Sequence, residues 1–285
     1  MTAALRAGLC QITSTDDVAE NVAMVAAALE RAADQGAQLA LTPEVSNMIS
    51  FNRTHQRAVL SEEASCPMLA AMREIAAKRG MWVLLGSLAV TTGDADGRFS
   101  NRSLMINAAG AIVARYDKIH MFDVDLEGRE SYRESAGYRP GDRAAVADTP
   151  WGRIGLTICY DMRFPALHRA LAEAGAAIIT SPAAFTVPTG RAHWHTLLRA
   201  RAIETGCFVL APAQTGAHPT RHDPGGRARR TYGHSLAVDP WGEVLADAGD
   251  APGVVMANLD LSRVADARGK VPSLANARTF LPPGA

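Results

Sequence analysis

The sequence predicts an α/β fold in which residues 1–285 form a single domain, a four-layer αββα sandwich. Strand-like and helix-like patterns alternate along most of the chain, and no low-complexity linker or change in composition divides it. After residue 213 the patterns are strand-like until a last short helix. Two sheets packed face to face with helices outside account for these observations, and 48% hydrophobic residues suffice for one large core.

In the first half, two helices separate strands that end close to polar residues. Residues 16–33 and 64–78 carry apolar residues at helical spacing, and Ser14 and Thr15 are candidate caps for the first helix. The expected strands are residues 4–12, 37–42 and 81–90, followed by a hairpin over 103–118 that turns at Ala109-Gly110.

The second half repeats this alternation. Helices are expected over residues 164–174, with Pro165 in the first turn, and over 191–204. The expected strands are residues 153–158, 176–180 and 207–213, a hairpin over 233–247 that turns at residues 239–242, and residues 253–261 before a helix from Ser262.

Composition excludes several classes of protein. Lys plus Arg and Asp plus Glu both number 29, so no net charge attracts nucleic acid or an anionic membrane. The four cysteines, Cys10, Cys66, Cys159 and Cys207, form no CxxC pair, and the start has no signal-peptide layout. No apolar run approaches the roughly 18 residues of a membrane span. We expect a cytoplasmic protein with reduced thiols and a small-molecule substrate.

Three polar residues each follow or end an apolar strand: Glu44, Lys118 and Cys159. In α/β proteins such positions commonly form the active site. Taken singly, each has an ordinary structural explanation, as a solvated loop carboxylate, a surface lysine and a core cysteine.

Together these residues suit nucleophilic catalysis. A thiol with a pKa of about 8.5 needs a base or a positive neighbour to react at neutral pH, and Glu44 is the candidate base. Lys118 would stabilise the negative charge that develops on a carbonyl oxygen, and it would also lower the pKa of the Cys159 thiol.

Four motifs carry a resemblance to a known family. TPEV at 42–45, YDKIHMFDVD at 116–125, YRESAGYRPGD at 132–142 and ICYDMRFP at 158–165 resemble the nitrilase superfamily of carbon–nitrogen hydrolases. The resemblance implies Cys159 as nucleophile, Glu44 as general base, Lys118 as stabiliser of the tetrahedral intermediate and Glu134 as a second, positioning glutamate. It also implies an αββα sandwich, a homodimer or higher homo-oligomer, and no cofactor or metal.

Three segments are most similar to the Nit branch: PAAFTVPTGRAHW at 182–194, LLRARAIET at 197–205 and DPWG at 239–242. Members of this branch hydrolyse the terminal amide of compounds such as deaminated glutathione or α-ketoglutaramate. A carboxylated substrate needs a cationic anchor, and Arg163 is the first candidate; an ion pair with Asp161 is the alternative. We also expect Tyr160, Phe185 and His193 to contact the substrate.

Three further interpretations stay open beside the Nit one: an N-carbamoyl amino acid hydrolase, a non-catalytic scaffold of the same fold, and a dinucleotide-binding enzyme, which the lack of a GxGxxG motif disfavours. Where the branch has AHWE, this chain has AHWH, with His195 in place of the glutamate. HWH contains no acidic neighbour, and we place it where a strand leads into a helix, so it does not predict a metal site. The basic run GGRARR at 225–230 lacks aromatic residues and is interpreted as a lid near the site rather than as a nucleic-acid contact.

Overall fold

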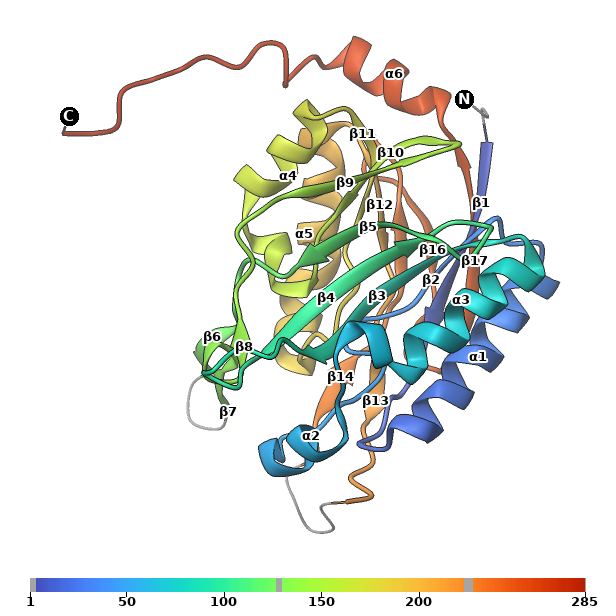
Figure 1. The fold of residues 1–285 in the computed structure, drawn as a ribbon. Coiled ribbons are helices and arrows are strands. Elements are labelled where there is room, and N and C mark those ends of the chain that lie inside the picture. Colours follow the sequence, from blue (N-terminus) through green and yellow to red (C-terminus); the bar gives the residue numbers. More distant parts are fainter. Residues whose placement is uncertain (1–3, 127–129, 223–227, 285) are drawn as a thin grey trace.

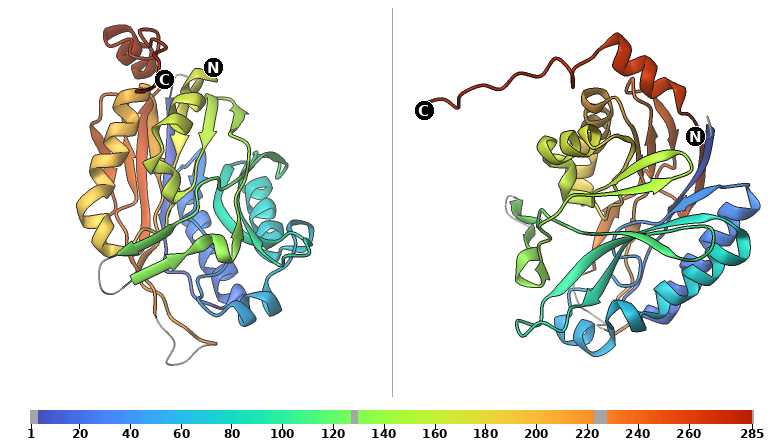
Figure 2. Two further views of the ribbon diagram at one scale, coloured as in Figure 1. Left: turned by 90° about the vertical axis from the view of Figure 1, so that its left-hand side faces the viewer. Right: turned by 45° about the horizontal axis from the view of Figure 1, so that its top comes forward.

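The computed structural model describes residues 4–126, 130–222 and 228–284. Two sheets pack face to face, with helices α1 (Val18–Asp34) and α3 (Pro67–Arg79) outside the first sheet and α4 (Pro165–Glu173) and α5 (Val187–Thr205) outside the second (Figures 1 and 2). The predicted four-layer sandwich is confirmed. Among the residues described, no helix has the length and apolar character needed to cross a membrane.

The first sheet has the order β17-β1-β2-β3-β4-β5, and β8 pairs with β4. In the middle of this sheet, β2 pairs in parallel with β1 and with β3. On either side, β17 pairs antiparallel with β1, and β4 pairs antiparallel with β3. Its strands are β17 (Gly253–Asp260), β1 (Ala4–Gln11), β2 (Leu39–Leu41), β3 (Trp82–Thr91), β4 (Phe99–Ile106), β5 (Ile112–Asp117) and β8 (Tyr138–Arg139).

The second sheet has the order β16-β15-β12-β11-β10-β9. Its parallel pairs, β10 with β11 and β11 with β12, are again flanked by antiparallel neighbours, so the two sheets share one pattern of pairing. Its strands are β16 (Val244–Asp247), β15 (Leu236–Val238), β12 (Phe208–Ala211), β11 (Ala176–Thr180), β10 (Gly152–Leu156) and β9 (Ala145–Thr149).

Alternation along the strands divides the core. Leu9 on β1 belongs to a core that extends from the first sheet through the second to α4 and α5, whereas its neighbour Cys10 belongs to a core beneath α1 and α3. On β3, Leu84 belongs to the first of these cores and its neighbour Val83 to the second. Successive strand residues point to opposite faces of a sheet, so a strand that is apolar on both faces lies between two layers.

Several boundaries differ from those expected. The cap of α1 is Asp17, whose Oδ1 accepts a hydrogen bond of 2.9 Å from the Glu20 backbone N–H, because Ser14 and Thr15 are held by Gln214 and Asn21. α5 begins at Val187 with a proline in its first turn, so HWH lies within a helix rather than at its start. Both predicted hairpins and the Pro165 start of α4 are confirmed.

Seven short helices and strands were not expected from the sequence, because each has too few residues to show a periodic pattern. They are α2 (Arg53–Val59), β6 (Asp123–Leu126), β7 (Glu130–Arg133), β8, β9, β13 (Thr215–Ala217) and β14 (Arg230–Tyr232). β6 pairs with β7 and β13 with β14 in small two-stranded sheets. α6 (Ser262–Lys270) follows β17, and residues 271–284 continue beyond it without a helix or strand (Figure 1).

Candidate active site

Three strand ends bring the predicted residues together. Glu44 lies three residues after β2, Lys118 directly follows β5, and Cys159 lies three residues after β10. β2 and β5 belong to the first sheet and β10 to the second, so the group forms where the two sheets face each other. All three side chains are buried.

Lys118 lies between two glutamates. Its Nζ donates hydrogen bonds of 2.8 Å to Glu44 Oε1 and of 2.9 and 2.8 Å to the two carboxylate oxygens of Glu134. The backbone N–H of Ala184 donates to Glu44 Oε2 at 2.9 Å, and that of Phe122 donates to Glu134 Oε2 at 2.7 Å. Each carboxylate is therefore held in one orientation by a cation and a backbone donor.

Cys159 stands on a strained turn. Its φ is +49°, a left-handed conformation that non-glycine residues rarely adopt, and its backbone N–H donates to the Pro182 carbonyl at 2.8 Å. Asp161, two residues later, holds the turn, because its Oδ2 accepts from the Ile158 backbone N–H at 2.8 Å and from the Tyr116 hydroxyl at 2.7 Å. The thiol itself interacts with the Glu44 carboxylate and the Ala184 backbone N–H.

The charges of the group set its protonation. Burial raises the pKa of the Cys159 thiol well above its usual range, the negative charge of Glu44 adds to this, and Lys118 offsets only part of it. The sequence analysis expected Lys118 to lower the pKa of this thiol, but burial and Glu44 outweigh that effect. Burial opposes ionisation of Glu44, but the positive charges of Lys118 and Arg229 outweigh it and hold the pKa of that carboxyl below its usual value.

Lys118 keeps its charge despite complete burial. Burial favours the neutral amine, but the carboxylates of Glu134 and Glu44 raise the pKa of Lys118 well above its usual value. The resting group therefore consists of a protonated thiol, an ionised Glu44 that is free to accept its proton, and a permanent ammonium between two carboxylates.

A cavity lies beside the buried group. Glu44, Asn101, Glu134 and Cys159 line it together with an apolar wall. That wall includes Met48, Ile49, Phe51, Phe122 and Phe185. An apolar cavity with a few convergent polar groups is the usual form of a small-molecule site.

Three arginines line the cavity, and none of them was predicted as a site residue: Arg53, Arg133 and Arg229. Arg229 uses its Nη2 to donate to the Ala184 carbonyl at 2.7 Å, and its buried Nε has no hydrogen-bond partner among the residues that the structure describes. Arg53, on α2, donates from Nη1 to Gln56 Oε1 at 2.8 Å and packs against the Tyr138 ring. Arg229 thus places a positive charge at the cavity, close enough to Glu44 to lower the pKa of that carboxyl.

The residues expected to bind substrate are only partly at this cavity. Phe185 lines it, whereas Arg163, Tyr160 and His193 do not belong to its lining. The Arg163 guanidinium lies over the rings of Tyr160 and Phe185, and its Nη2 is 3.2 Å from His193 Nδ1. The alternative ion pair of Arg163 with Asp161 is not formed, because Asp161 is bonded to Tyr116, Ile158 and His120.

Sequence patterns gave little indication of the site residues that were not predicted. Asn101 is a buried polar residue within β4 and donates to Glu44 Oε1 at 3.0 Å, but a single polar residue in a strand is not distinctive. Arg229 belongs to the basic run at 225–230, of which residues 225–227 lie outside the described residues. Arg53 lies on a helix too short to be predicted.

The whole chain was then compared with known proteins. Residues 6–269 match the family described as carbon-nitrogen hydrolase. The chain belongs to the carbon–nitrogen hydrolase family. The resemblance to the nitrilase superfamily is confirmed, and this carbon–nitrogen hydrolase has relatives of similar length.

The deaminated glutathione amidase of Yersinia enterocolitica is 40% identical over 95% of this chain and 92% of its own. The crystal structure of the Caenorhabditis elegans NitFhit protein superposes with a TM-score of 0.88 at 37% identity, covering 97% of this chain and 66% of that longer chain. A mutant of the amidase from Nesterenkonia sp. AN1, with acrylamide added at its active site cysteine, has a TM-score of 0.75 at 26% identity over 94% of this chain and 98% of its own. The predicted class, a hydrolase that acts on amides, is confirmed.

Proposed function

We propose that this carbon–nitrogen hydrolase is a cysteine-dependent amidase that releases ammonia from the terminal amide of a small carboxylated substrate, of the deaminated glutathione or α-ketoglutaramate type. The relative from Yersinia enterocolitica is named for the first of these activities. One observation carries the chemistry: a buried thiol that interacts with an ionised glutamate beside a fixed ammonium.

In the first half-reaction, Cys159 Sγ attacks the amide carbon while its proton passes to Glu44. Because the pKa of the thiol is raised and that of Glu44 is lowered, this transfer takes place with the attack rather than before it. Negative charge then develops on the carbonyl oxygen, and the Lys118 ammonium stabilises it. The carbon–nitrogen bond breaks, the leaving amine takes the proton from Glu44, and ammonia departs.

The second half-reaction hydrolyses the resulting thioester. Glu44 takes a proton from a water molecule, whose oxygen attacks the thioester carbon. The carbon–sulfur bond then breaks, the sulfur takes back its proton from Glu44, and a carboxylic acid leaves. Glu134 positions Lys118 throughout, since both of its oxygens accept hydrogen bonds from Nζ.

Arg229 is the better placed anchor for the substrate carboxylate. Arg229 lines the cavity and its buried Nε lacks a partner among the described residues, whereas Arg163 does not belong to the cavity lining. A guanidinium binds a carboxylate through charge-assisted hydrogen bonds. The anchor predicted at Arg163 is therefore replaced in this proposal by Arg229.

The test is ammonia release from deaminated glutathione, α-ketoglutaramate, an N-carbamoyl amino acid and a simple nitrile, with Cys159→Ala as the control. We expect release from one or both of the first two and none from the variant. Release from the carbamoyl compound alone would favour the carbamoyl amino acid hydrolase instead. Absence of release from all four compounds, with the protein folded, would refute the amidase proposal.

A further inference from the structure

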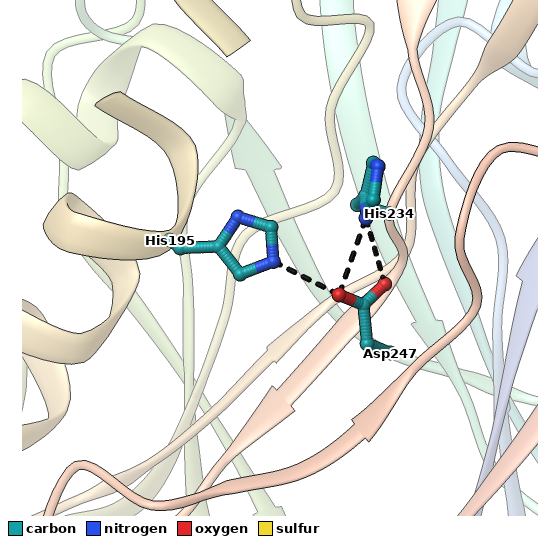
Figure 3. A group of neighbouring side chains, drawn as sticks. All are labelled: His195, His234 and Asp247. Atoms are coloured by element: carbon teal, nitrogen blue, oxygen red, sulfur yellow. Dashed lines mark hydrogen bonds and ion pairs between the residues drawn. The ribbon is translucent and has the colours of Figure 1, made fainter. Parts of the chain in front are cut away.

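A second group of functional side chains lies apart from the cavity, and its three members come from separate segments. His195 projects from α5, His234 lies two residues before β15, and Asp247 ends β16 (Figure 3). One ligand atom from each lies within 4.8 Å of the other two. The three residues therefore gather where α5 meets the β15–β16 hairpin.

The Asp247 carboxylate lies between the two imidazoles. Its Oδ2 is 2.9 Å from His195 Nε2, and its Oδ1 is 2.9 Å from His234 Nδ1. Around a tetrahedral zinc ion with bonds of about 2.0–2.2 Å, ligand atoms lie about 3.4 Å apart. The hydrogen-bonded separations must open by only about half an ångström to admit an ion, a change that side-chain rotation provides.

The group is held in place by its surroundings. The His234 backbone N–H donates to the Gly249 carbonyl, its carbonyl accepts from Trp194 Nε1 at 2.8 Å, and its φ of +57° is a left-handed conformation that a histidine adopts only when its surroundings impose it. The Gly249 backbone N–H donates to Asp247 Oδ1 at 2.9 Å. Such outer contacts orient the ligands of a metal site before the ion binds.

Charge and access suit a cation. The Asp247 carboxylate supplies negative charge at neutral pH, which favours binding of a cation. The side chains of His195, His234 and Asp247 are 37%, 26% and 32% exposed, which leaves one side open to an ion and to water. Two imidazoles and a carboxylate form a donor set that zinc favours.

We propose that His195, His234 and Asp247 bind a divalent zinc ion, with water as the fourth ligand, and that the ion fastens α5 to the β15–β16 hairpin. Each neutral imidazole then carries its proton on the other ring nitrogen, Nδ1 in His195 and Nε2 in His234. The HWH segment alone gave no reason to expect a metal, because Asp247 comes from a strand 52 residues further along the chain.

The site has a path of contacts to the cavity wall. Trp194, the neighbour of His195 on α5, packs against Phe185 with ring centroids 5.1 Å apart, and Phe185 lines the cavity. Zinc at this position stabilises the helix that supports that wall. It takes no part in the proposed bond-breaking steps, which use Cys159, Glu44 and Lys118.

The test is equilibrium dialysis of the chelator-treated protein against zinc chloride, with metal analysis and thermal unfolding. His195→Gln retains a polar side chain but loses the imidazole ligand, and His222→Ala is a matched control that removes another exposed histidine paired with an aspartate, Asp17, at 3.2 Å. The Cys159→Ala protein is measured in parallel, so that zinc bound by the thiol is distinguished.

We expect one zinc ion per chain and a higher unfolding temperature with zinc in the unaltered protein, in His222→Ala and in Cys159→Ala. In His195→Gln the affinity should fall by about a hundredfold or more, and the rise in unfolding temperature should be lost. Equal zinc affinity in His195→Gln and the unaltered protein would overturn the assignment, as would less than one ion per chain at saturation. If His195, His234 and Asp247 are joined only by hydrogen bonds and bind no zinc, one of those two results will be observed.

Discussion

Replacement of Arg229 by alanine tests how the substrate is held. Arg229 uses Nη2 to bind the Ala184 carbonyl at 2.7 Å, and its buried Nε has no partner among the described residues. One hydrogen bond from the Arg229 guanidinium to a substrate carboxylate is worth about 1.5–3 kcal/mol, because it is assisted by charge. Its loss lowers kcat/KM for a carboxylated amide roughly 10- to 150-fold.

The assay compares α-ketoglutaramate with its methyl ester, which has the same reacting amide but no carboxylate charge. Arg229→Ala also removes the bond to Ala184 and a positive charge that lowers the pKa of Glu44, but both effects act equally on the two substrates. The ratio of the two kcat/KM values therefore isolates the anchor. Arg163→Ala is the matched control, since Arg163 lies outside the cavity lining and the ratio should stay unchanged.

An equal loss on the acid and the ester would refute the anchor at Arg229. A changed ratio in Arg163→Ala with no change in Arg229→Ala would return the anchor to the residue that the sequence first suggested. Both variants should be checked by circular dichroism for an unaltered fold.

Three further predictions concern the buried group. Lys118→Met should reduce the single-turnover rate by about 10²–10³ with a smaller effect on substrate binding, and an unchanged rate would remove Lys118 from the stabilising role. Cys159→Gly and Cys159→Ala should both lack turnover. The glycine variant should nevertheless have a free energy of unfolding in urea about 1 kcal/mol higher than the alanine variant, because residue 159 has a φ of +49°. Equal free energies of unfolding would show that the turn is unstrained. The lowered pKa of Glu44 keeps the base ionised below the usual glutamate range, so kcat/KM should fall only in more acidic solution; in Lys118→Met the pKa rises, and this acid limb should move to higher pH. A limb that stays in place in Lys118→Met would contradict this account of Glu44.

The sequence was sufficient to predict the four layers of the fold and the buried catalytic group of Glu44, Lys118 and Cys159. Long strands such as β3 and helices such as α4 have enough residues to show a period, and their ends were predicted within a few residues. Glu44, Lys118 and Cys159 were predicted because each lies at the end of an expected strand or within three residues of the observed one. The short α2 has no comparable pattern, and Arg53 was missed with it.

The remaining site residues depend on contacts between distant segments. Arg229 is hydrogen-bonded to Ala184, and Asp247 to His195. These partners are far apart in the sequence, so no local sequence pattern predicts that they meet. The raised pKa of the thiol also could not be predicted from the sequence, because it depends on how completely Cys159 is buried and how close Glu44 lies. Assembly into a homo-oligomer stays a prediction.

The pairing of β17 beside β1 has a consequence for how the protein folds. Ala4 pairs with Asp260 and Gln11 with Gly253, so one edge of β1 stays open until residues near the other end of the chain are available. Contacts this distant in sequence slow folding, and an open strand edge invites pairing with other chains. During synthesis on the ribosome, the first sheet therefore emerges incomplete, and the edge of β1 needs shielding until β17 has been made.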